Sequence, residues 1–553
     1  MMSDGNSQVT RPRPRLRFDF WTAGALVIAV VVLSPILSIM WIALHPTENI
    51  WPHLWATVLP RYLGNTLVLM AGVAVLTGVV GTGAAWLVTM YRFPGQRWLA
   101  HALLFPLAIP AFVGAYALVD VLDYAGPVQT GLRLLFGWTS ARDYWFPETR
   151  SLWAAVLVLS AALYPYVYLL ARAAFREQSG STHEVARALG TGPWGLFWRV
   201  GLPMARPAIA AGVALAMMET VADYGTVYYF GVQTLTTGIF STWLNGGNAG
   251  GAAQIAGVIL MLILILVALE RTGRRKARFH RVTRADRPIV PQPLGRRAGW
   301  LAFGLCAVPF VLGFVLPVAV MLYLSVQNPG AWIAPDLGKA LVNTLVVAGG
   351  ASLATVGAAL FLVYALRMAG RGVARVVLPV TLIGYAAPGA VLALGLLIPL
   401  AALDNRLADA VLALTGYDPG LMITGTAFAL GLAYLVRFFG IAQGALDAAF
   451  GRVAPSLPMA ARSLGRTAGG ALGAVYLPLM RGSVATALLV VFVDCVKELP
   501  ATLLLRPFNY NTLSTRVYEL ASLERLSEAA PAALIVMAVG LLAVALLARA
   551  NRG

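Results

Sequence analysis

The sequence has 553 residues, of which 59% are hydrophobic and only 12% are charged. Soluble domains carry about 25% charged residues, so this composition excludes an ordinary soluble protein. Apolar runs of ~20 residues predict membrane-spanning helices rather than barrel strands. We therefore expect an all-α integral membrane protein.

The chain begins with a polar tail, residues 1–20, followed by the apolar run Trp21–Leu44. That run is too long for a signal peptide and lacks a small-x-small cleavage site, so we expect an uncleaved first span. Twelve spans are predicted in all, at roughly 21–44, 63–90, 98–122, 151–175, 204–231, 252–270, 299–326, 341–366, 374–402, 420–444, 479–505 and 529–549.

The basic stretch 271–297 lies between two groups of six spans. We interpret it as a cytoplasmic linker that joins a first unit, 21–270, to a second unit, 298–553. Lys and Arg are concentrated in alternate loops, which predicts that both termini are cytoplasmic. The basic residues assigned to that side include Arg172, Arg367 and Arg437.

The net charge of +18 could suggest nucleic acid, but its placement fits membrane orientation and contact with lipid headgroups better. We expect no nucleic-acid partner. Cys306 and Cys495 lie in apolar runs and indicate neither a disulfide nor a metal site. We expect no metal and no cofactor in this chain.

One polar stretch occurs twice: EVARALGTGPWGLFWRVGLP at Glu184–Pro203 and MAARSLGRTAGGALGAVYLP at Met459–Pro478. The copies align without a gap, 275 residues apart. Each predicts a short helix that a glycine ends, and a Leu-Pro whose proline can open the next helix. An isolated copy would suggest an interfacial amphipathic helix, whereas two on one membrane face indicate a docking surface.

This spacing resembles the EAA loop of ABC-transporter permeases: Glu-Ala-Ala, three residues, Gly, nine residues, then Ile-x-Leu-Pro. The second copy departs from it at Met459, where the acid is missing. The resemblance implies ATPase-coupling helices at about 181–194 and 456–469. The residues it assigns to coupling are Glu184, Ala186, Arg187, Gly190, Pro203, Ala460, Ala461, Arg462, Gly465 and Pro478.

The halves also match outside these loops, since Asn65-Thr66-Leu67 corresponds to Asn343-Thr344-Leu345. Six spans per half make this a parallel repeat, with the substrate path between the halves. The fold expected from the resemblance is that of a type I ABC importer permease, with two parallel six-helix repeats.

The chain has no nucleotide-binding motif of its own. A P-loop needs Gly-Lys followed by Ser or Thr, and none of the three lysines, Lys276, Lys339 and Lys497, has that context. We therefore expect a non-enzymatic permease whose energy comes from ATP hydrolysed by a partner subunit. A membrane enzyme is disfavoured because the sequence contains no catalytic constellation.

Charged residues within spans are costly and usually functional. The predicted fifth span of each half carries such residues at corresponding positions, and we assign them to a candidate translocation path. They are Glu219, Asp223, Asp494, Lys497 and Glu498. The i, i+3 spacing of Asp494 and Lys497 equally allows a mutually neutralising pair.

A narrower resemblance covers nearly the whole chain. The segments Leu122–Thr130, Leu163–Phe175, Ala222–Phe240 and Lys497–Ala530 are similar to fused ferric-iron permeases. This implies a bacterial inner-membrane protein that takes iron from a periplasmic binding protein by alternating access, with two ATPase subunits below. Thiamine, polyamine and phosphonate permeases share the architecture and are the alternatives.

A secondary transporter of six plus six spans, driven by an ion gradient, is the competing class. The repeated signature of the major facilitator family lies in the loop between the second and third spans and has an Asp before its basic cluster. The corresponding loops here read YRFPGQRW and RMAGRGVARV, without that Asp.

Overall fold

The computed structural model describes residues 20–46, 48–275, 289–369, 377–382, 384 and 387–550. Most of the predicted N-terminal tail and much of the predicted linker lie outside these residues. Twelve described helical segments are long and apolar enough to cross a membrane, which confirms the predicted all-helical class and number of spans.

In the first unit the elements are α1 (Phe20–Leu44), α2 (Trp51–Thr57), α3 (Leu59–Met90), β1 (Tyr91–Arg92), α4 (Gln96–Ala102), η1 (Phe105–Ala108), α5 (Ala111–Leu122), α6 (Pro127–Phe136), α7 (Leu152–Arg176), α8 (Gly180–Ala188), α9 (Pro193–Leu196), η2 (Phe197–Gly201), α10 (Leu202–Ala222), α11 (Gly225–Tyr229), α12 (Leu235–Phe240), η3 (Ser241–Asn245) and α13 (Ala249–Arg275). The short strand β1 pairs in parallel with β2, which lies ahead of the second unit.

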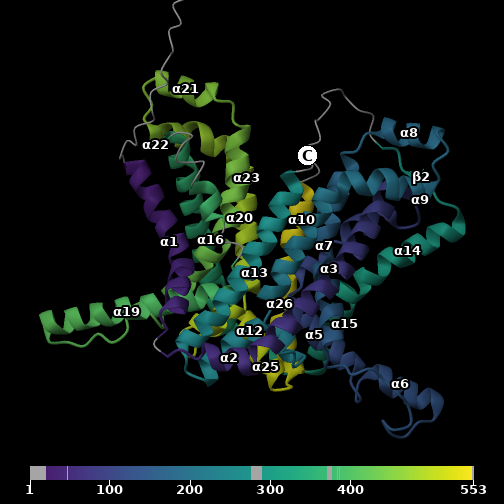
Figure 1. Cartoon of the computed structure of the whole chain (residues 1–553), viewed down its shortest axis with the longest axis horizontal. Coiled ribbons are helices and arrows are strands. Elements are labelled where there is room, and N and C mark those ends of the chain that lie inside the picture. The colour runs from purple at the N-terminus through teal and green to yellow at the C-terminus, as the bar shows by residue number, and fades with distance from the viewer. Residues whose placement is uncertain are drawn as a thin grey trace, which may run out of the picture.

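From there on the elements are β2 (Gln292–Pro293), α14 (Arg296–Phe310), η4 (Val311–Val315), α15 (Leu316–Gln327), η5 (Pro329–Ile333), α16 (Pro335–Ala369), α19 (Gly389–Thr415), α20 (Ala427–Arg452), α21 (Ser456–Ser463), α22 (Ala468–Ala471), η6 (Leu472–Tyr476), α23 (Leu477–Lys497), α24 (Pro500–Leu505), α25 (Leu513–Ser522) and α26 (Leu526–Ala550). Figure 1 shows α8 and α21 at one end of the bundle and α6, α12 and α25 toward the other.

The repeat extends to individual hydrogen bonds. The Asn65 side-chain amide donates to the Gln233 carbonyl at 2.8 Å, and that of Asn343 donates to the Asn511 carbonyl at 3.0 Å. The next residue, Thr66 or Thr344, accepts the N–H that opens the last short helix of its unit. Both units therefore fold around the same internal contacts.

The first span of each unit packs on the other unit. Helix α1 contacts α16 and α19, whereas α14 contacts α3 and α4, and α15 contacts α5. Trp21 of α1 stacks on Phe361 of α16, with ring centroids 5.1 Å apart. The largest buried core likewise joins Phe112 and Tyr116 of the first unit to helices of the second.

Two proline-containing spans differ from the predicted helix starts, and a third shares their geometry. Pro203 does not open a helix, because α9, η2 and α10 form one helical run through a π-helical turn at 197–201. Pro478 and Pro317 follow similar π turns, η6 and η4. A proline lacks its N–H and crowds the carbonyl four residues earlier, and the wider turn relieves that clash.

Several predicted span boundaries were wrong. The span at 98–122 is divided into α4, η1 and α5, with Pro106 and Pro110 at the breaks. The spans 204–231 and 479–505 end at Ala222 and Lys497, and short helices follow them. Helix α19 starts only at Gly389 and continues to Thr415.

Candidate translocation cavity and coupling helices

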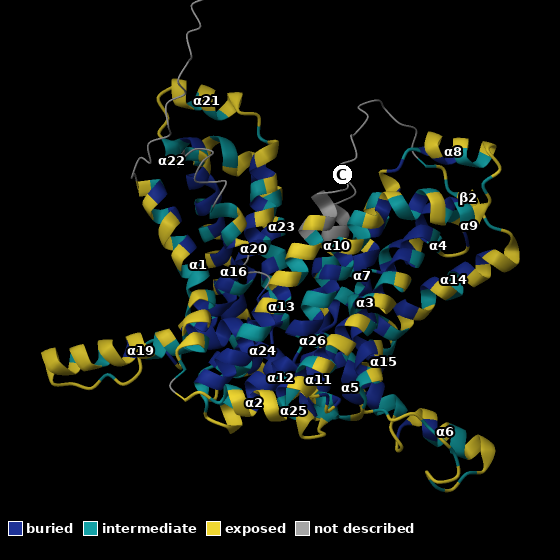
Figure 2. Cartoon of the chain, viewed as in Figure 1, coloured by how far each residue is buried: buried dark blue, intermediate teal, exposed yellow. Residues whose placement is uncertain are grey.

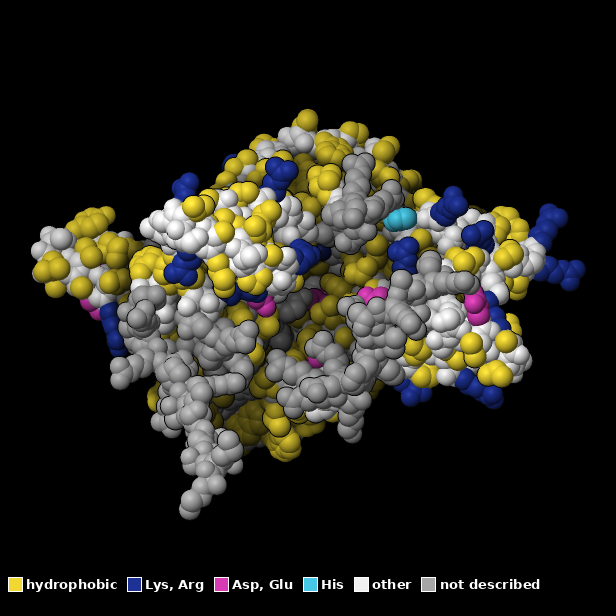
Figure 3. Space-filling view, turned by 90° about the horizontal axis from the view of Figure 1, so that it is seen from above, with side chains coloured by type: hydrophobic (Ala, Val, Ile, Leu, Met, Phe, Trp, Pro, Cys, Tyr) yellow, Lys and Arg dark blue, Asp and Glu magenta, His cyan; other side chains and the backbone are white. Residues whose placement is uncertain are grey.

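A cavity of about 180 Å³ lies between the two units. Its walls come from η1, α5, α7, α10 and α11 of the first unit and from α20, α23 and α24 of the second. Viewed from the end that carries α8 and α21, the molecule is hollowed between two lobes, with Lys and Arg side chains around their outer surfaces (Figure 3).

All five residues assigned to the path by sequence line this one cavity: Glu219, Asp223, Asp494, Lys497 and Glu498. Their bonding divides them into three kinds: helix-capping acids, an ion pair, and a carboxylate that has no partner among the described residues.

Asp223 and Glu498 hold the N-termini of the short helices that follow their spans. The N–H groups of Thr226 and Val227 donate to Asp223 Oδ1 at 3.0 and 3.1 Å. In the second unit, Ala501 and Thr502 donate their N–H groups to Glu498, both at 3.0 Å. These carboxylates satisfy backbone donors that a helix start leaves unpaired, which is a structural role.

Glu498 also lies beside a cation that sequence analysis misplaced. Arg437 Nε is 3.7 Å from Glu498 Oε1, and both side chains are largely buried. We assigned Arg437 to a cytoplasmic loop, but it lies within α20 and lines the cavity. The sequence could have indicated this position, because Arg437 is the single charged residue of the predicted span 420–444. A charge within a span usually faces the bundle interior.

Lys497 joins the two units. Its Nζ lies 3.3 Å from Asp494 Oδ1, so the pair that the spacing allowed is formed. The same Nζ donates to the Leu107 carbonyl of η1 at 3.1 Å. This second contact crosses the interface between the units and couples α23 to the broken third span.

Glu219 is the acid of the first unit that corresponds to Asp494, 275 residues later. It forms no hydrogen bond or ion pair within the described part of the chain. The cavity lining contains four acidic and two basic side chains. A cavity with this excess of negative charge attracts cations and repels anions.

An aromatic cluster, which we call the aromatic plug, comprises Tyr224, Tyr228, Phe240 and Tyr518 and lies on the side of the cavity away from α8 and α21. Tyr224 lines the cavity and stacks on Phe240 with centroids 3.7 Å apart. Its hydroxyl lies 3.2 Å from that of Tyr518, which belongs to the other unit. The plug therefore lies across the interface that a substrate between the units has to pass.

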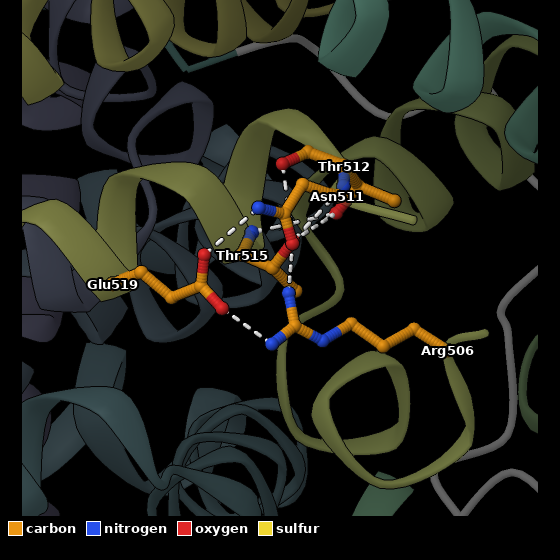
Figure 4. Close-up of polar contacts among 5 residues, drawn as sticks. All are labelled: Arg506, Asn511, Thr512, Thr515 and Glu519. Atoms are coloured by element: carbon orange, nitrogen blue, oxygen red, sulfur yellow. Dashed lines mark hydrogen bonds and ion pairs between the residues drawn. The ribbon is translucent and has the colours of Figure 1, made fainter. Parts of the chain in front are cut away.

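The loop that follows α24 is longer than its counterpart in the first unit. It has seven residues, 506–512, whereas the loop after α11 has five, 230–234, and its tip carries Phe508, whose surface is 95% exposed. Figure 4 shows its base, where Arg506 pairs with Glu519 and donates to Asn511, and where Asn511 donates to Glu519 at 2.9 Å. Thr512 and Thr515 then form a capping box that starts α25.

The predicted coupling helices are present but shorter than expected. Helix α8 ends at Ala188 and α21 at Ser463, because Gly190 and Gly465 adopt φ angles of 82° and 84°. In each copy the residue after the glycine donates its N–H to the carbonyl five residues earlier, at 3.1 Å. This left-handed glycine ending is a common helix C-cap.

The coupling helices expose apolar side chains. Leu189 and Leu464 occupy corresponding positions and are 81% and 85% exposed. Glu184 is exposed on α8, as is Met459 on α21. An exposed apolar patch of this kind marks a contact surface for another protein.

The two coupling surfaces are unequal. Beyond α8 the first unit exposes Trp194 and Trp198, where the second has Gly469 and Gly473. Helix α8 is also anchored by buried His183, whose ring lies near that of Trp86. We did not assign the two tryptophans to the site, although both lie inside the repeated stretch.

Residues 77–271 match the family model described as binding-protein-dependent transport system inner membrane component. The chain is 27% identical over 532 residues to the Fe(3+)-transport system permease protein FbpB 2 of Haemophilus influenzae, a match that covers 94% of this chain and 96% of the relative. The chain is thus similar along nearly its whole length to a transport-system permease, and it is called the permease below.

Single-unit relatives match only part of the permease. The sulfate transport system permease protein CysT of Escherichia coli is 26% identical and covers 45% of the permease, with 91% of its own length. The molybdenum transport system permease protein ModB of the same organism is 27% identical and covers 35%, with 85% of its length. The permease is thus a fusion of two units in one multi-pass membrane protein.

Proposed function

We propose that the permease moves ferric iron from a periplasmic binding protein into the cytoplasm by alternating access. The observation that carries this proposal is the match along nearly its whole length to a permease named for Fe(3+) transport. The excess of acidic side chains in the cavity supports a cationic substrate over the oxyanions sulfate and molybdate. Thiamine and polyamines remain candidates because they are also cationic.

The proposed energy source is a pair of ATPase subunits, one on α8 and one on α21. The exposed Leu189 and Leu464 provide corresponding apolar contacts for the pair. This arrangement puts the α8 and α21 end, with both termini, on the cytoplasmic side of a bacterial inner membrane. The binding protein then docks at the opposite end.

The conformation described here corresponds to one state of the proposed cycle. The aromatic plug closes the route toward the binding protein, while the lobes around α8 and α21 are separated by a hollow (Figure 3). ATP-driven approach of the two ATPase subunits would draw α8 and α21 together and open the plug. The contact between Lys497 and the Leu107 carbonyl crosses the same interface and has to change in that step.

The test is transport by purified complex. The permease is reconstituted in liposomes with its ATPase and loaded binding protein, and uptake of radioactive ferric iron is measured with and without ATP. Sulfate, molybdate, thiamine and spermidine are offered in parallel. We expect ATP-dependent uptake of iron and no uptake of the other four solutes. Uptake of another solute without iron would reject the substrate, and uptake independent of ATP would reject the mechanism.

A further inference from the structure

Two arms extend sideways from the bundle at the end opposite α8 and α21 (Figure 1). One arm is α6, and the other is the outer half of α19, residues 403–415. They occupy corresponding places, because α5 and α6 together match α19. Both helices end at a left-handed glycine, Gly137 and Gly416, with φ of 71° and 72°. Figure 2 shows that both arms are largely exposed.

The outer half of α19 has one apolar side. Leu403, Leu407 and Leu414 recur at the spacing of a single helix face and are all exposed, Leu414 by 86%. Arg406 lies at the flank of this side, and Asp409 lies opposite to it, where Leu412 is also exposed. This separation is the pattern of an amphipathic helix whose apolar side needs cover.

Helix α6 repeats the pattern. Val128, Leu135 and Phe136 fall on one side of the helix and are exposed, Leu135 by 78%. Arg133 lies on the other side, where it donates to Tyr144 at 3.2 Å and to Thr130 at 3.0 Å. Both arms therefore leave apolar side chains uncovered.

The return segment of each arm covers a side of its helix that lies next to the exposed apolar residues. Tyr144 of the first arm donates to Gln129 at 2.6 Å. In the second arm, buried Asp404 accepts the N–H groups of the residues at 422–424, at 2.7 to 2.9 Å. In Figure 1 each return segment runs below its helix.

We propose that both arms lie flat in the lipid headgroup region, on the side of the membrane opposite α8 and α21. Their apolar sides face the acyl chains. They point in opposite directions, away from the central cavity, so the surface next to them is the lipid around the bundle. Exposed aromatic residues on both arms are consistent with a position in the headgroup region: Trp145 is 85% exposed, and Tyr417 is exposed. Trp and Tyr favour the membrane interface, and amphipathic helices lie in its plane.

A binding protein is the other conceivable occupant, but the geometry favours lipid. A protein that delivers substrate has to cover the plug, which lies where the units meet. The arms, and the apolar sides that they carry, run away from the place where the two units meet. The proposal concerns how the permease sits in its membrane and does not depend on which substrate it carries.

The test uses single cysteines labelled with an environment-sensitive dye in nanodiscs. Leu135→Cys and Leu414→Cys report on the apolar sides, and Arg406→Cys and Asp409→Cys are matched controls on one arm. The native Cys306 and Cys495 are buried, so unmodified permease provides the labelling blank. Lipids with a nitroxide near the headgroup are expected to remove most fluorescence at 135 and 414 and little at 406 and 409.

Two results would overturn the proposal. One is equal quenching of the apolar and control positions, which would mean that the arms have no fixed orientation at the surface. The other is unquenched dye at 135 and 414 that becomes shielded only when binding protein is added, which would make the arms a protein-docking site. All four positions are exposed, and gel filtration confirms that each variant remains folded.

Discussion

Asp223 and Glu498 cap equivalent short helices, but only Glu498 has a cation beside it. The position in α7 that corresponds to Arg437 is Ala162, and both residues line the cavity. The two units therefore repeat their backbone contacts without repeating their charges. Several predictions on stability and transport rest on that difference.

We expect Glu498→Gln to lower thermal stability more than Asp223→Asn. Both amides can still accept one helix N–H, so each weakens a cap worth about 1 kcal/mol. Glu498→Gln additionally leaves Arg437 buried without a counter-charge, a change that costs about 3 kcal/mol in buried pairs. Thermal unfolding in detergent measures the order, and Arg437→Met should reduce the difference when combined with Glu498→Gln. Equal losses would show that Arg437 does not stabilise Glu498.

Glu219→Gln should slow iron uptake while leaving assembly and basal ATPase activity unchanged. Its carboxylate forms no hydrogen bond or ion pair among the described residues, and the two cations that act on it from a distance, Arg437 and Lys497, keep Glu498 and Asp494 as partners. Combined neutralisation of Glu219 and Asp223 should slow uptake further but also weaken the α11 cap. Wild-type uptake by Glu219→Gln would exclude this carboxylate from the path.

Lys497→Met should be more harmful than the double change Asp494→Asn and Lys497→Met. The single change leaves Asp494 within the bundle without its cation, and breaking a buried pair costs more than replacing it. Both variants lose the contact with Leu107, so their comparison isolates the ion pair. Expression level and thermal stability are the readouts. The opposite order would show that the pair adds nothing to folding.

Tyr518→Phe should loosen the plug. It removes the hydroxyl contact with Tyr224 that crosses between the units, together with contacts to Ser522 and Tyr228 within reach of the same hydroxyl. The loss of one such contact costs about 1 kcal/mol, which corresponds to roughly fivefold in an equilibrium. We expect basal ATPase activity to rise by up to that factor in the absence of binding protein. Tyr323→Phe, at an exposed position on α15, is the control. Unchanged basal activity would mean that the plug does not limit the cycle.

Gly190→Ala and Gly465→Ala should weaken coupling between ATP hydrolysis and uptake. A side chain at φ near 80° costs about 1–2 kcal/mol, although a Cβ would meet no atom at either site. Gly192→Ala is the matched control, since Gly192 has an ordinary φ of −69° and open surroundings. ATPase binding and the ratio of iron moved to ATP hydrolysed are the measurements. Full coupling in both glycine variants would contradict the docking role of α8 and α21.

The sequence was sufficient for the number of spans, the repeat and the glycine helix ends. Apolar runs, the 275-residue offset and the left-handed preference of glycine are local or periodic signals. The exchange of α1 and α14 between units was not predicted, because it depends on which helices meet in space. The pairing of Tyr224 with Tyr518 depends on contacts between residues 294 positions apart. Pro106 and Pro110 indicated that the third span is broken, but the prediction followed hydropathy alone and placed one continuous span at 98–122.

The unlike charges of the two units have a consequence for assembly. If the two units were separate chains, each could associate with a copy of itself, as a like pair, as well as with the other unit. A like pair of first units would lack Lys497 and Arg437, and a like pair of second units would lack Glu219. Because both units belong to one polypeptide, they are always present in a one-to-one ratio. The two units also differ at Met459 and in the loop bearing Phe508.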